Sequence, residues 1–180
     1  VVGTVTVRLG SDFQNNGTVS CGGYANAAYS VATVGSLSLT FRGSMPQKFT
    51  NLYGAGYASG SNSDASVHGD ARFTFDGVDY TGGATLYAYL GGKAEISKNA
   101  KLNISGDIAV HVTNSSNMPS CVIHPAGSNI TTGSNTSVVV DSGSYCDTVY
   151  GGGSHAKVKT ANIKVSGASV NNLYGGGAYS

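Results

Sequence analysis

A short motif that recurs along the chain constrains its fold more than any other feature. The motif is an apolar residue, then a residue that is usually Tyr, then a run of glycines, as in "NLYGGG" and "TVYGGG". Its copies lie at 18–23, 51–56, 87–92, 122–127, 148–153 and 172–177. Repeats of this kind predict a solenoid, because each unit is too small to bury its own apolar face and depends on its neighbours to cover it.

A second motif, apolar-x-apolar-x-Gly, alternates with the first. Its copies end at Gly43, Gly77, Gly106, Gly143 and Gly167. The apolar pairs predicted to point inward are Leu39/Phe41, Phe73/Phe75, Leu102/Ile104 and Ile163/Val165. This alternation is typical of strands, so we expect an all-β parallel β-helix of about six rungs. A β-sandwich is the alternative, although it would give frequent turn signals without requiring self-similar strands.

Composition agrees with one folded domain over residues 1–180. Charged residues make up only 11% of the chain and 27 of its 180 residues are Gly, but 11 Tyr and the alternating apolar strands argue against disorder.

A net charge of +1 gives no basis for binding nucleic acid. No apolar run is long enough for membrane insertion. Both ends are interpreted as truncations of a longer protein, and an uncovered rung favours end-to-end self-association.

Aligning the copies of the first motif on their last Gly separates inward from outward positions. The inward column is Val19, Leu52, Ala88, Ile123, Val149 and Leu173. Because side chains alternate along a strand, the residues that follow point outward. These are Ser20 and then the ring column, which we define as Tyr53, Tyr89, His124, Tyr150 and Tyr174. Asn51 and Asn172 lie in the neighbouring outward column.

The ring column is the candidate ligand site. Aromatic rings pack against sugar rings, and the amides of Asn51 and Asn172 would hydrogen-bond their hydroxyl groups. The alternative is structural, in which each ring covers the bare glycines of the adjacent rung. Composition and spacing leave both interpretations open.

Two of the three cysteines fall at nearly the same place in consecutive copies of the repeat. Cys121 and Cys146 are therefore candidates for a disulfide if the protein is exported. The alternative is a pair of buried thiols acting as small apolar side chains. Cys21 lies within a glycine run and is expected to be unpaired.

Residues suited to catalysis or metal binding are scattered. The four His show no metal-ligand spacing, so no metal or cofactor is expected. Asp76, Asp79 and Asp107 form the best candidate acidic cluster, with a solvated turn as the favoured interpretation. Arg42 and Asp76 are expected to form a surface ion pair. We therefore predict no enzymatic activity, with a polysaccharide-cleaving enzyme as the less favoured alternative.

The motifs "NLYGGG", "TVYGGG" and "IKVSG" resemble the glycine-rich repeats of large bacterial cell-surface proteins, adhesin-like proteins with right-handed parallel β-helices. The resemblance covers most of the chain and is poorest over 107–137. It implies an extracellular or surface-attached protein that binds a host or environmental glycan or a surface protein. It also implies the alternative of a stalk that carries another domain. No catalytic residues of such proteins carry over to this chain.

Overall fold

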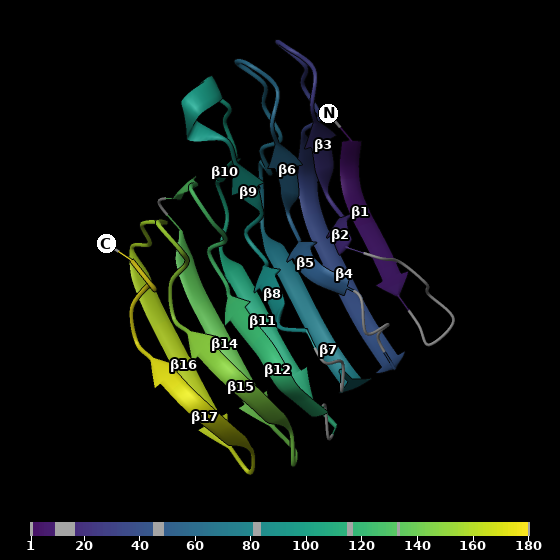
Figure 1. Cartoon of the computed structure of the whole chain (residues 1–180), viewed down its shortest axis with the longest axis vertical. Helices are drawn as coiled ribbons and strands as arrows, with labels where there is room; N and C mark the ends of the chain where they lie inside the picture. The colour runs from purple at the N-terminus through teal and green to yellow at the C-terminus, as the bar shows by residue number, and fades with distance from the viewer. Residues whose placement is uncertain are drawn as a thin grey trace.

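The protein is all-β. The computed structural model describes residues 2–9, 17–44, 49–80, 84–114, 117–132 and 134–179. Within these ranges every strand pair is parallel, and successive strands of each stack lie side by side as the chain progresses (Figure 1). Helix is confined, in this part of the chain, to the single turn η1 (Ile96–Lys98).

Two stacks of strands form the body of the protein and together make its largest sheet. The first stack contains β1 (Val2–Leu9), β4 (Val34–Ser44), β7 (Ala71–Asp79), β11 (Ile108–Thr113), β14 (Asn135–Asp141) and β16 (Thr160–Ser166). The second contains β2 (Gly17–Ser20), β5 (Phe49–Tyr53), β8 (Leu86–Tyr89), β12 (Asn117–His124), β15 (Tyr145–Tyr150) and β17 (Ser169–Tyr174). Strands of the two stacks alternate along the sequence, which is the arrangement expected of a β-helix or other solenoid.

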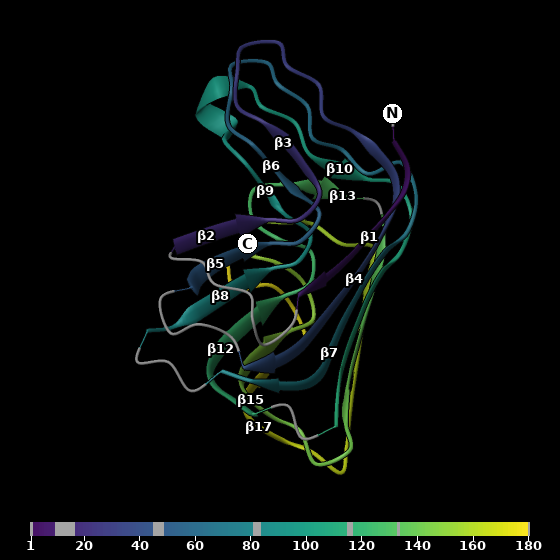
Figure 2. The same ribbon diagram turned by 90° about the vertical axis from the view of Figure 1, so that its right-hand side faces the viewer.

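Shorter strands form the remaining sides of each repeat. One stack comprises β3 (Gly23–Ala25), β6 (Gly56–Ala58) and β9 (Lys93–Ala94), and another pairs β10 (Asn103–Ile104) with β13 (Thr131–Thr132). Isolated parallel bridges extend the first of these stacks from Lys93 through Ser128 and Ser154 to Tyr179. Figure 2 shows that β3, β6 and β9 leave β2, β5 and β8 at an angle, so that the two stacks enclose a corner.

The predicted inward column is confirmed by the strand register. Val19 pairs with Leu52, Leu52 with Ala88, and Ala88 with Ile123, which continues to Val149 and Leu173. The middle members of this column are completely buried, and side chains of the first stack pack against them in one core. Phe41 and Phe75 stack there with ring centroids 4.7 Å apart.

One copy of the second motif was placed wrongly by the sequence. Phe73 pairs with Val110 of β11, and not with Leu102 or Ile104, which are buried just before and within β10. The chain turns near or just after the ends of these strands at residues with positive φ: Gly43 (74°), Gly77 (63°), Asn114 (59°), Ser142 (55°) and Gly167 (64°). Asn reaches this left-handed conformation more easily than most residues, so the third repeat turns without glycine.

The glycine runs of the first motif pack directly on one another. A Cβ atom added to Gly92 would lie 2.5 Å from the carbonyl oxygen of Gly56, and one added to Gly127 would lie 2.3 Å from that of Gly92. Both residues also have positive φ, of 87° and 78°. Glycine is required at this corner because neighbouring backbones are in contact there.

One of the predicted contacts between charged side chains is present in the structure and another is not. Arg42 and Asp76 form the predicted ion pair, at 2.7 Å. The predicted approach of Asp107 to Asp76 is wrong, because Asp107 precedes β11 whereas Asp76 lies near the end of β7. Instead, the backbone N–H of Asp107 donates to the Asp70 carboxylate at 3.1 Å.

Within the described ranges, no helix has the length and apolar character needed to cross a bilayer.

Candidate functional site

The ring column forms as predicted and is continuous over five repeats of the chain. Its members are the last residues of β5, β8, β12, β15 and β17. Centroid distances are 5.8 Å for Tyr53–Tyr89, 5.0 Å for Tyr89–His124, 4.6 Å for His124–Tyr150 and 4.8 Å for Tyr150–Tyr174. These spacings follow from in-register parallel pairing, which repeats at about 4.8 Å and places like side chains above one another.

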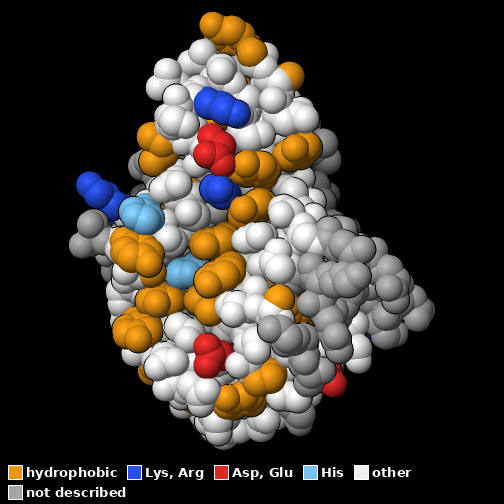
Figure 3. Space-filling view, viewed as in Figure 1, with side chains coloured by type: hydrophobic (Ala, Val, Ile, Leu, Met, Phe, Trp, Pro, Cys, Tyr) orange, Lys and Arg blue, Asp and Glu red, His pale blue; other side chains and the backbone are white. Residues whose placement is uncertain are grey.

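Stacking covers the ring faces inside the column. The planes of His124 and its two tyrosine neighbours differ by only 9° and 10°. A sugar ring packs on the face of an aromatic ring, and the faces of Tyr89, His124 and Tyr150 are occupied by each other. The rings inside the predicted ligand site are therefore stacked on one another, and a ligand could reach only their edges. Figure 3 shows this face of the protein, with hydrophobic side chains and histidine gathered near its middle.

His124 is the most enclosed polar member of the column, with 4% of its surface exposed. Burial lowers its pKa from 6.5 to about 4. Its Nδ1 atom is buried and makes no hydrogen bond within the described part of the chain. The imidazole is therefore neutral near pH 7 and contributes as a flat aromatic surface.

The two asparagines predicted to assist the column are engaged locally. The side-chain amide of Asn51 donates to the hydroxyl of Thr50 at 3.2 Å, and that of Asn172 donates to Thr148 at 3.3 Å. Tyr174 is 47% exposed and stacks, among the described rings, on Tyr150 alone. The column thus ends at one side in an accessible ring.

A second set of rings joins the other end of the column. Tyr24 and Tyr57 pair in register and stack with centroids 5.8 Å apart, and Tyr57 lies 5.0 Å from Tyr53. These three rings, with Thr18 and Ser20, line a cavity of about 520 Å³ at the corner between the stacks. We name this set of five residues the tyrosine hollow.

The tyrosine hollow combines an accessible ring with a hydroxyl that lacks a partner. Tyr24 is 55% exposed and, among the described rings, stacks only on Tyr57. Ser20 occupies the place where the ring column would continue, since it pairs in register with Tyr53. Its hydroxyl is buried and makes no hydrogen bond in the part of the chain that the structure describes. A buried hydroxyl without a partner is unusual in proteins, and Ser20 is one of the residues that line this cavity.

An ionic network fixes Tyr57 at the edge of the hollow. Its hydroxyl donates to the Glu95 carboxylate at 2.9 Å, and Lys93 lies 3.1 Å from the same oxygen atom. Burial and the bond to Glu95 raise the pKa of Tyr57 to about 12. The same bond, together with Lys93, lowers the pKa of Glu95. Tyr57 is thereby held protonated, with its hydroxyl hydrogen committed to Glu95.

The rings outside the predicted column were missed by the sequence analysis. The signal was present, because "GYA" follows the glycine run at both 23–25 and 56–58. Tyr179 and His155 form a further stacked pair, with centroids 4.8 Å apart. Tyr24 and Tyr57 each lie one residue after the last Gly of their run, and His155 and Tyr179 each lie two residues after it, so alignment on the last Gly superposes each pair.

The cysteines are free thiols. Cys146 pairs with Met118 and Cys121 with Leu86, because the register between β12 and β15 shifts between Met118 and Val122. The two were predicted to lie at nearly the same place in consecutive repeats; they are not register partners, and the structure contains no bond between them. Burial raises the pKa of Cys146 to about 12 and that of Cys121 well above its usual value. Both thiols lie in the core as small apolar side chains.

Among the described residues, no three His, Cys, Asp or Glu side chains come together as potential metal ligands. No family model, curated protein or solved structure matches this chain.

Proposed function

We propose that this chain is a non-catalytic segment of an adhesin-like surface or secreted bacterial protein, and that it binds a neutral glycan in the tyrosine hollow. In this proposal the chain is a right-handed β-helix of about six rungs, as expected from its repeats. The ring column serves as the spine that fixes the hollow. The protein is extracellular, where glycans are encountered.

The unpaired Ser20 hydroxyl in the same cavity as the exposed ring of Tyr24 carries the proposal. A sugar presents an apolar face of C–H groups and an edge of hydroxyl groups. Tyr24 has an accessible face, and Ser20 supplies a buried hydroxyl without a partner. The cavity of about 520 Å³ has the size of a small-ligand site.

The test is binding to a glycan array by the parent protein and by Tyr24→Ala. Truncating this exposed ring should weaken binding about tenfold, because an aromatic contact of this kind contributes roughly 0.5–1.5 kcal/mol beyond its buried area. Tyr87→Ala is the matched control, since Tyr87 is an exposed tyrosine of the same face that does not line the hollow. Equal binding by the parent and Tyr24→Ala would contradict the proposed site.

A structural spacer is the second candidate function, favoured by the continuous stacking inside the ring column. A spacer needs a rigid stack and no exposed ring faces, which describes Tyr89, His124 and Tyr150. Failure of the parent protein to bind any glycan on the array would favour this alternative.

A further inference from the structure

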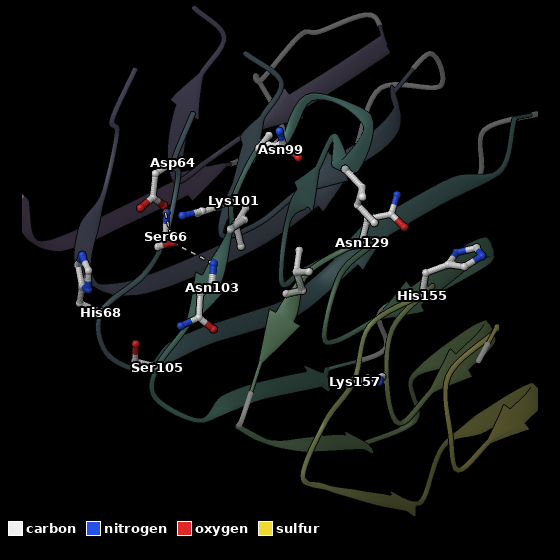
Figure 4. A pocket seen from close by; sticks show the side chains of 14 residues that line it. Asp64, Ser66, His68, Asn99, Lys101, Asn103, Ser105, Asn129, His155 and Lys157 are labelled. Carbon is white, nitrogen blue, oxygen red and sulfur yellow. Dashed lines mark hydrogen bonds between the residues drawn. The ribbon is translucent and has the colours of Figure 1, made fainter. Parts of the chain in front are cut away.

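A polar groove lies on another side of the repeats, away from the tyrosine hollow. Its cavity of about 870 Å³ is lined by parts of four successive repeats, as Figure 4 shows. The lining comes from the segment before β7, from η1 and the residues up to β10, and from the turns around Asn129 and His155. The apolar side chains of Leu102 and Ile130 are buried in this lining.

The turns beside the groove share one backbone conformation. Tyr29, Asn62, Asn99, Asn129 and His155 have φ angles of 53–59°. In each of these repeats a single left-handed residue makes the turn. Asn is enriched in this conformation, so amide side chains are brought to the rim of the groove by the requirements of the turn.

The groove contains cations without ion-pair partners. Neither Lys101 nor Lys157 has a carboxylate within 4.0 Å among the described residues. Asp64, the acid of the lining, instead accepts hydrogen bonds from the backbone N–H and the hydroxyl of Ser66, at 2.9 and 2.5 Å. Two histidines, His68 and His155, also line the cavity. The balance of charge therefore favours an anion.

Uncharged donors and acceptors accompany these cations. The side chains of Asn103 and Asn129 make no hydrogen bond within the described part of the chain and so are available to a ligand. Ser105 directly follows Ile104, which forms a parallel bridge with Val67, and it lines the same groove. Amides and hydroxyls at regular spacing suit a ligand that carries many hydroxyl groups.

The backbone argues against a peptide as the ligand. Peptides commonly bind as an added strand at an open sheet edge. Here the N–H of Lys101 donates to Ser63 at 2.8 Å, and the N–H of Ala65 donates to Lys101 at 3.0 Å. These backbone groups are thus paired between repeats and are not free to add a strand.

We infer that this groove binds an anionic oligosaccharide, with carboxylate or sulfate groups held by Lys101 and Lys157 and sugar hydroxyls by Asn103 and Asn129. The site is separate from the tyrosine hollow and shares no residue with it. It would give the protein a second glycan specificity, for charged chains.

The experiment is titration calorimetry with a hyaluronan tetrasaccharide, which carries carboxylates, and with its carboxyl-reduced, neutral form. We expect binding of the charged form that weakens as salt is raised, and binding of the neutral form at least tenfold weaker. Lys101→Gln and Lys157→Gln should each weaken binding of the charged form about tenfold. Lys98→Gln is the control, because Lys98 lies in η1 but does not line the groove.

Three results would overturn the inference. These are no binding of the charged tetrasaccharide at millimolar concentration, equal loss on Lys98→Gln, and equally tight binding of a tetraglutamate peptide, which would indicate a general anion surface. Circular dichroism of each variant checks that it remains folded. Tyr24→Ala should leave this binding unchanged, so failure here is distinguishable from failure of the tyrosine hollow.

Discussion

At the scale of single residues, His124 shows how stacking can place a titratable group in an apolar environment. The residue was predicted to point outward, and it does leave the core, yet its tyrosine neighbours enclose it almost completely. Sequence alternation identified the direction of the side chain. It did not identify the burial, because that depends on rings supplied by the repeats before and after.

Stability should therefore depend on pH between about 6.5 and about 4. The pKa of His124 is lower in the folded protein than in the unfolded chain. Burial of the neutral ring therefore contributes fully to the free energy of unfolding above pH 6.5, and this contribution is lost as the pH falls toward about 4. The loss should reach on the order of 3 kcal/mol. Urea unfolding of the parent and of His124→Tyr across this range measures it. An unchanged pH dependence in His124→Tyr would contradict this account.

At the scale of strands and turns, the glycine corner is the most demanding part of the fold. From Gly56 onward, the last glycine of each run packs against the carbonyl group of the last glycine in the previous repeat, so a side chain has no space at that position. The sequence predicted the corner and its strands correctly because glycine is invariant at the last position of the motif. It misplaced the third copy of the second motif because Asn114 replaces glycine at that turn.

Gly92→Ala should destabilise the protein by on the order of 2–4 kcal/mol, from backbone strain at φ 87° and contact with Gly56. Gly176→Ala is the matched control, since a Cβ there meets nothing within 4 Å. We expect its effect to be below about 0.5 kcal/mol. Chemical denaturation measures both, and similar values for the two variants would disprove the contact argument.

The tyrosine hollow was only partly predictable from sequence. Tyr53 was identified from its column, whereas Tyr24 and Tyr57 each follow the last Gly of their run directly, at a position that carries no ring in the later repeats. The angle between the stacks decides that these rings meet. That angle depends on the backbone of the corner and has no counterpart in the alternation of apolar residues.

At the scale of the whole molecule, protection of the core is uneven along the stack. Leu52 and Ile123 are completely buried, but Leu173, at the equivalent position of β17, is 51% exposed. Val165 of β16 is likewise exposed. In the described part of the chain, β16 and β17 each have a strand on one side only.

Hydrogen exchange should follow this gradient. The amides of β17 should exchange at least about tenfold faster than those of β8, because local opening there exposes little further apolar surface. Mass spectrometry of peptic peptides from the 180-residue chain measures the difference. Uniform protection from β8 to β17 would show that the repeats open as one unit.

The parallel register also has a mechanical consequence. Hydrogen bonds between repeats run along the direction in which the repeats are stacked, so a pull in that direction loads every interface between repeats alike and opens the weakest one first. Such a molecule should lengthen in steps, with each step releasing one repeat. The stacked rings, which bridge the same gaps, would then set how much force each step requires.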